Sequence, residues 1–200
     1  MAYAASTAPE AVAVLVACHL TFCSRCREVV GDLDALAPAL APSPDVAALP
    51  PVEALFDRLA SDGTPSLPPT RRPDDDPLPR PLRERVGGLA DLAWRRLPLG
   101  VAQAWLELDG AHAFLVDFPA GMTLPDHHHE GVERAMPLVG GFTAEGVSYG
   151  PGDLSVAEGD AVHHVKVDED GRCLCLFVND GEVVPQSATL RIVGRLLGLS

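Results

Sequence analysis

The stretch that most constrains this chain is residues 121–140, GMTLPDHHHEGVERAMPLVG. Its fixed points are Gly121, His127, His129, Glu133 and Gly140. His127 and His129 are two residues apart, so on a β-strand their side chains project from the same face. Glu133 can return to that face a few residues later. Two imidazoles and one carboxylate form a partial shell for a divalent transition metal, and a fourth ligand is still needed. The stretch therefore predicts a metal site built on β-strands.

A second stretch, GDLSVAEGDAVHH, begins at Gly152 and includes His163 eleven residues later. Together the two stretches resemble the two motifs of the cupin family. The first motif is matched at every fixed position, and the second is matched less closely, because Glu158 and Asp160 stand where the family has proline and glycine. The resemblance implies one metal shell, made of His127, His129, Glu133 and His163.

Residues 1–60 have a helical pattern. Ser6 or Thr7 can cap a helix that carries Pro9 in its first turn, and Ser24 can start the next helix. A third short helix is predicted over 51–60. Residues 61–81 then form a linker, since seven prolines in these 21 residues can sustain neither a helix nor an inner strand.

From about residue 86 the hydrophobic period changes to two, in short stretches bounded by turns such as VAQAWLEL, HAFLVDF and CLCLFV. This pattern predicts an antiparallel β-sandwich or barrel. Pro137 lies inside one predicted strand, and it should therefore sit at an edge or a bulge. Residues 189–199 are amphipathic and predict a terminal helix.

A second cluster of metal-binding residue types lies in CHLTFCSRC at 18–26. His19 and Cys23 are four residues apart, so a helix brings them onto one face. Cys23 and Cys26 form a Cys-x-x-Cys corner, which fits two thiolates on one zinc. The alternative is a thioredoxin-like redox pair, which would need a preceding strand in a βαβ unit. Helical patterns surround the motif, so zinc is favoured.

His-x-x-x-Cys-x-x-Cys in a short helical segment, followed by a cupin, resembles ChrR-type zinc-binding anti-sigma factors. The resemblance extends over nearly all 200 residues. It implies an α+β chain in three parts: a helical zinc-binding anti-sigma domain over 1–60, the linker over 61–81, and an antiparallel cupin sandwich or barrel over 82–200. The helical zinc ligands would be His19, Cys23 and Cys26.

One departure from that family concerns the start of the chain. The family has a further zinc-ligating histidine near the start of its first helix, whereas this sequence begins at Met1-Ala2-Tyr3 without one. Either the true start lies further upstream and supplies the missing histidine, or the site keeps three protein ligands. A three-ligand site should hold zinc more weakly, because structural zinc sites normally have four. Cys18 is expected to be a buried structural residue, and Cys173 and Cys175 are expected to pack as small hydrophobic side chains.

Charge and hydropathy exclude several classes of function. The net charge of −13 argues against direct binding to nucleic acid, which requires a basic face. The apolar run at 11–17 is too short to span a bilayer and lacks a basic segment before it. An odd number of cysteines, five, favours metal binding or reactive thiols over a disulfide framework. We therefore expect a cytoplasmic protein.

The resemblance implies that the helical domain sequesters an extracytoplasmic-function sigma factor. The cupin would sense an oxidative or singlet-oxygen signal and release the sigma factor, with zinc and no catalytic residues. Two alternatives stay open: a cupin-type iron dioxygenase, and a non-catalytic metal-binding cupin with a vestigial helical domain. A homodimer through the cupin is a further option.

Overall fold

The computed structural model describes residues 2–40, 76–125, 127–129, 131–159, 164–181 and 183–185. Its helices are α1 (Glu10–Phe22), α2 (Ser24–Leu40) and α4 (Arg80–Val86), with single 3₁₀ turns η2 (Leu89–Asp91) and η3 (Pro98–Gly100). The helices predicted over 51–60 and 189–199 lie outside the described residues, as does the linker up to residue 75.

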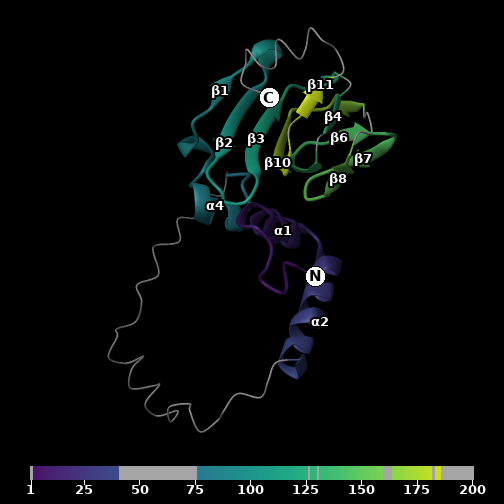
Figure 1. The fold of residues 1–200 in the computed structure, drawn as a ribbon. Helices are drawn as coiled ribbons and strands as arrows, with labels where there is room; N and C mark the ends of the chain where they lie inside the picture. The colour runs from purple at the N-terminus through teal and green to yellow at the C-terminus, as the bar shows by residue number, and fades with distance from the viewer. Residues whose placement is uncertain are drawn as a thin grey trace.

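The strands begin at residue 95 and form three antiparallel sheets. Six of them form one sheet in the order β1-β2-β3-β10-β5-β8. Three more form the sheet β7-β6-β9, and β11 pairs with β4. Their bounds are β1 Arg95–Arg96, β2 Ala102–Leu106, β3 His112–Phe118, β4 His127–His129, β5 Val132–Val139, β6 Phe142–Ala144, β7 Val147–Tyr149, β8 Ser155–Glu158, β9 Val165–Val167, β10 Cys173–Asn179 and β11 Val183–Pro185. The predicted α+β class, helices first and antiparallel strands after, is confirmed (Figure 1).

Two hydrophobic cores cover the two faces of the six-stranded sheet, because alternate residues of each strand face opposite ways. On β10, Leu174 and Leu176 belong to the core shared with the helices. Cys173 and Cys175 belong to a second core that includes Phe142 of β6. The molecule thus has a helical layer, a large sheet and a small sheet.

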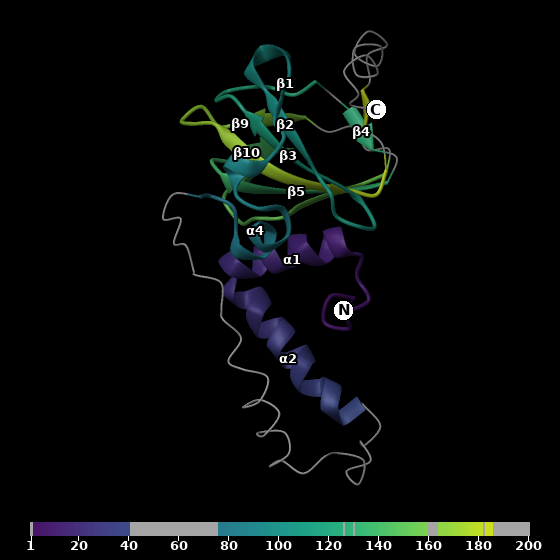
Figure 2. The same ribbon diagram turned by 90° about the vertical axis from the view of Figure 1, so that its left-hand side faces the viewer.

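Helix α1 shares the first of these cores with the sheet. Its buried residues follow helical spacing and line one face: Ala11, Val14, Leu15 and Cys18. Figure 2 shows α1 lying beneath the sheet beside α4, whereas α2 leads away from it. Leu78, within the range that we assigned to the linker, is also buried in this core. The division of the sequence into parts at 1–60 and 82–200 did not anticipate this packing.

A backbone hydrogen bond and an ion pair hold the start of α1 in place. Pro9 occupies the N-cap position without a side-chain cap, and the Ala11 N–H donates to the Asp109 carbonyl at 3.0 Å. Glu10 accepts from the Asp109 N–H and pairs with Arg85 of α4 at 3.2 Å. The predicted cap at Ser6 or Thr7 was therefore wrong, because the helix begins at Glu10 and the Thr7 hydroxyl donates to the Ala2 carbonyl instead.

Pro137 lies at a bulge, as predicted. It sits opposite Cys175, and the register of β5 with β10 shifts between Leu174 and Cys175. The partner β8 pairs only with Val132–Ala135, so the strand position of Pro137 needs no N–H donor towards β8. The carbonyl of Pro137 instead accepts a hydrogen bond from the Gly152 N–H at 2.9 Å.

Candidate metal centres

The helical cluster combines the end of α1 with the start of α2. His19 lies in the last turn of α1, Cys23 lies between the two helices, and Cys26 lies in the first turn of α2. Cys23 has an extended backbone conformation, with φ −95° and ψ 105°, which ends α1 and redirects the chain. One ligand atom from each of the three side chains lies within 4.8 Å of the other two.

Hydrogen bonding within this cluster favours a thiolate at Cys23. The backbone N–H of Cys26 and then its side chain donate to the Cys23 sulfur, and both lower the pKa of Cys23. The same side-chain hydrogen bond raises the pKa of Cys26, which holds its proton as the donor. Two sulfur atoms beside an imidazole are a donor set that can hold a transition metal ion.

The strand-borne residues are buried polar groups. His127 of β4 and Glu133 of β5 each have 8% of their surface exposed. Nδ1 of His127 lies 2.8 Å from the Pro125 carbonyl oxygen, which can only accept, so this nitrogen carries a proton. In the neutral ring, Nε2 therefore has the lone pair that a metal requires.

Asn179 is a buried hydrogen-bond partner of Glu133 that the sequence analysis missed. It lies opposite Glu133 in the pairing of β10 with β5, and its Nδ2 donates to Oε2 of Glu133 at 3.3 Å. Asn179 is itself buried, with 2% exposed. A hydrogen bond of this kind orients a ligating carboxylate. The sequence could have indicated this residue, because Asn179 is a polar residue that ends the otherwise apolar run CLCLFVN.

Comparisons with known proteins place this architecture in a family. The model of the ChrR cupin-like domain matches residues 83–184. The anti-sigma-E factor ChrR of Cereibacter sphaeroides is 37% identical over 186 residues, covering 90% of this chain and 85% of that protein. The chain belongs to the ChrR family. The crystal structure of Rhodobacter sphaeroides SigE in complex with the anti-sigma ChrR matches with a TM-score of 0.69 and 35% identity, covering 90% of this chain and 93% of that one.

The similarity to ChrR includes the helical part. The cupin-like domain alone spans 83–184, so an alignment of 186 residues must extend into the segment that carries the helical cluster. His163 and the side chain of His129 lie outside the described residues, although the backbone of His129 pairs with Val183. The four-residue cupin shell therefore stays a prediction in this ChrR-family chain.

The other three cysteines are buried thiols, and all five described cysteines are free of disulfides. Burial raises the pKa of Cys18 to about 12, partly offset by a hydrogen bond with the Leu82 backbone. Burial likewise raises the pKa of Cys175 well above its usual value. Cys18 is a core residue of α1, as predicted, and Cys173 and Cys175 pack between the sheets.

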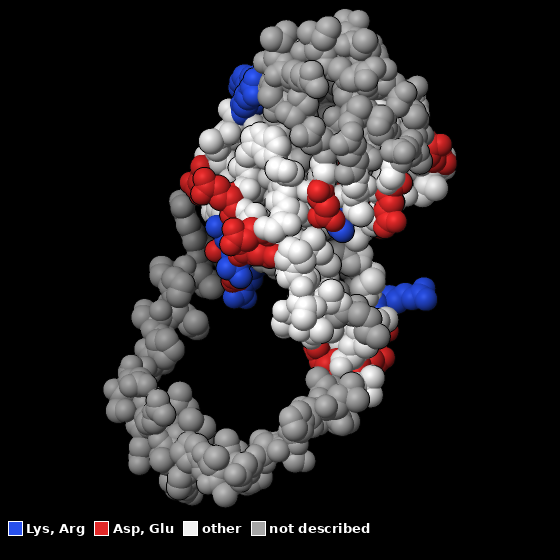
Figure 3. All heavy atoms as spheres, viewed as in Figure 1, with Lys and Arg blue, Asp and Glu red and all other residues white. Residues whose placement is uncertain are grey.

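The charges on the described surface and the lengths of the described helices bear on the expected partners. Figure 3 shows acidic and basic side chains interspersed on the viewed face, without a broad basic patch over the described part. Within the described ranges, every helix is too short or too polar to cross a membrane.

Proposed function

We propose that this chain is an anti-sigma factor that sequesters a sigma factor of the extracytoplasmic-function class. The observation that carries the proposal is the similarity, over nine-tenths of the chain, to ChrR in its complex with SigE. This similarity also favours a binding protein over a cupin dioxygenase, because the protein matched along both parts is an anti-sigma factor.

Helix α2 is the element best suited to contact the sigma factor. It leads away from the sheet (Figure 1). Its apolar side chains Val29 and Leu36 are 53% and 55% exposed. Phe22, at the end of α1, is 44% exposed. Exposed large apolar side chains on a helix with few intramolecular contacts are typical of a partner surface.

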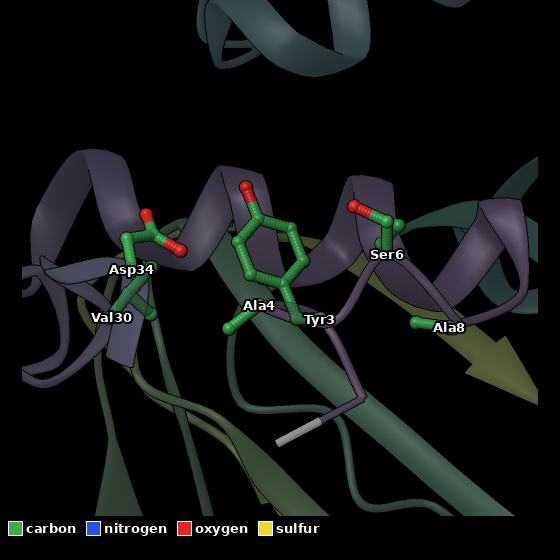
Figure 4. Close-up of a pocket in the computed structure, with 7 residues that line it drawn as sticks. Tyr3, Ala4, Ser6, Ala8, Val30 and Asp34 are labelled. Carbon is green, nitrogen blue, oxygen red and sulfur yellow. The ribbon is translucent and has the colours of Figure 1, made fainter. Parts of the chain in front are cut away.

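A pocket of about 390 Å³ lies between the N-terminal segment and the two helices. Figure 4 shows Tyr3 and Ser6 on the N-terminal segment, with Val30 and Asp34 on the α2 side. A side chain of the sigma factor could anchor there, since buried anchors supply most of the binding free energy of an interface.

Zinc is the metal that we propose for the helical cluster. Bound to His19, Cys23 and Cys26, it would join the end of α1 to the start of α2. Metal binding in a small helical unit contributes directly to its folding free energy. The presentation of α2 to the sigma factor would therefore depend on the zinc.

The cupin is proposed as the sensor, with zinc held by His127, His129, Glu133 and His163. An oxidative or singlet-oxygen signal would release the sigma factor only if it changed the free energy of the bound and released forms differently. We propose a cytoplasmic protein, in which the cupin provides the surface for any homodimer.

The test is transcription by RNA polymerase with the cognate sigma factor. The wild-type chain should inhibit transcription, and His19→Gln should inhibit much less, because the helical cluster loses its imidazole. His112→Gln is the matched control, since His112 is an exposed histidine of β3 outside both clusters. No inhibition by the wild-type chain would contradict the proposal and favour a vestigial helical domain.

A further inference from the structure

His19 has a hydrogen-bond partner from the sheet part of the molecule. Its Nδ1 lies 2.7 Å from the carbonyl oxygen of Gly152, which is 133 residues away in the sequence. A carbonyl oxygen only accepts, so Nδ1 must carry the proton. The other nitrogen, Nε2, is then the atom whose lone pair a metal could use. This hydrogen bond selects the tautomer of the imidazole in the helical cluster.

Gly152 belongs to a tightly held turn between β7 and β8. The Asp153 N–H donates to the Gly150 carbonyl at 3.0 Å, and the Gly150 N–H donates to Oδ2 of Asp153 at 2.9 Å. The Gly152 N–H donates to the Pro137 carbonyl on β5. Hydrogen bonds within the turn and one hydrogen bond to β5 thus fix the position of the Gly152 carbonyl, which accepts from His19.

The end of α1 lies directly against this turn. Gly152 is buried, with φ +86°, and a Cβ at this position would collide with the side chain of Phe22. Only glycine allows both the left-handed backbone and the close approach. The side chains of His19 and Phe22 therefore both lie against the backbone of Gly152, so the metal-binding end of α1 is docked on this turn.

We propose that the turn Gly150–Asp153 is the part of the cupin that positions the helical metal site, with the Gly152 carbonyl holding His19 in its metal-binding tautomer. The inference rests on the metal site of the proposed function and extends it. Gly152 is a positioning residue, because its carbonyl acts on the metal only through His19.

The same hydrogen bonds connect the two candidate metal centres. Glu133 lies on β5, four residues before Pro137, whose carbonyl holds Gly152. A displacement of β5 at the cupin shell therefore moves the acceptor of His19. Linkage makes the coupling reciprocal: metal binding at the helices stabilises the docked turn, and displacement of the turn weakens metal binding by the same factor.

The test compares Gly152→Ala with Gly146→Ala in the full chain. Gly146 also has a left-handed φ, +77°, but a Cβ there meets nothing within 4 Å, so it controls for backbone strain alone. Cobalt(II) is the probe, because thiolate-to-cobalt charge-transfer absorption reports the cysteine site and not a shell of histidine and glutamate. Losing such an outer hydrogen bond should weaken cobalt binding about 10–100-fold in Gly152→Ala.

Gly146→Ala should bind cobalt as the wild type does. Equal cobalt affinity in Gly152→Ala and the wild type would overturn the inference and leave the metal site of the proposed function intact. Absence of the charge-transfer band from the wild-type chain would overturn both.

A second measurement does not depend on how Gly152→Ala folds. Nitrogen-15 chemical shifts of His19 in the zinc-loaded wild-type chain should show a protonated Nδ1 and a metal-bound Nε2. Metal bound through Nδ1 would overturn the inference, because the Gly152 carbonyl could not then accept from that nitrogen.

Discussion

Helix α1 should unfold together with the sheet, and Leu15→Ala tests this. Leu15 is fully buried in the core that α1 shares with β3, β5 and β10. Truncating a fully buried leucine removes its transfer free energy and leaves a cavity, which costs about 2–5 kcal/mol of unfolding free energy. We expect Leu15→Ala to lower the free energy of unfolding by an amount within this range, towards its lower end if α1 moves inwards to fill the cavity.

The assay is urea unfolding followed by two probes. Far-ultraviolet circular dichroism reports all helices and strands. Tryptophan fluorescence comes from Trp94, at the border of the shared core, and from Trp105 on β2, so it reports the sheet side. With one shared core, both probes should shift to lower urea together in Leu15→Ala. Leu36→Ala on α2 is the matched control: its side chain is 55% exposed, so the change should stay within about 0.5 kcal/mol.

The reasoning fails if Leu15→Ala costs less than about 1 kcal/mol, since a fully buried leucine in a close-packed core costs more than that. It fails also if the dichroism signal shifts while the fluorescence transition stays in place. In that case the helices and the cupin would unfold as separate units.

Two further predictions concern the metal-binding side chains. After removal of metal by a chelator, iodoacetamide should label Cys23 at lower pH than Cys26, because hydrogen bonds lower the pKa of Cys23 and raise that of Cys26. Cys18, buried and with a pKa raised to about 12, should be labelled only on unfolding; mass spectrometry of peptides measures all three. Asn179→Leu should weaken metal binding at the cupin about 10–100-fold, because Glu133 loses its hydrogen-bond donor; calorimetric titration with zinc measures this.

A specific result would refute each of these two predictions. If Cys26 were labelled at lower pH than Cys23, Cys23 would be the donor and Cys26 the acceptor of their side-chain hydrogen bond. The calorimetric titration is made in a Cys23→Ser, Cys26→Ser background, so that the helical cluster does not contribute. Unchanged zinc affinity in Asn179→Leu would mean that the Asn179 hydrogen bond does not support Glu133.

Features of short range could be predicted from the sequence. His19, Cys23 and Cys26 lie within one helix turn and one corner, so their spacing alone brings them together. The strands were found because a half-buried strand alternates apolar and polar residues. The bulge at Pro137 follows from its missing N–H.

Contacts between residues far apart in the sequence could not be predicted from it. The buried face of α1 is visible as an apolar stripe, but no local pattern says that this stripe packs on the sheet, so residues 1–60 were treated as a separate domain. The hydrogen bonds of His19 with Gly152 and of Glu133 with Asn179 join residues far apart in the sequence, 133 and 46 positions respectively. Such pairs depend on strand register and helix docking, which are set by the whole fold.

The central claim is that this chain binds a sigma factor through a helical part organised by metal. The most direct measurement is calorimetric titration of the cognate extracytoplasmic-function sigma factor into the zinc-loaded chain and into its Cys23→Ser, Cys26→Ser variant. The account predicts a tight equimolar complex with the wild-type chain and strongly reduced binding to the variant. Equal binding by both would contradict the role of the metal, and no binding by the zinc-loaded wild-type chain would contradict the claim itself.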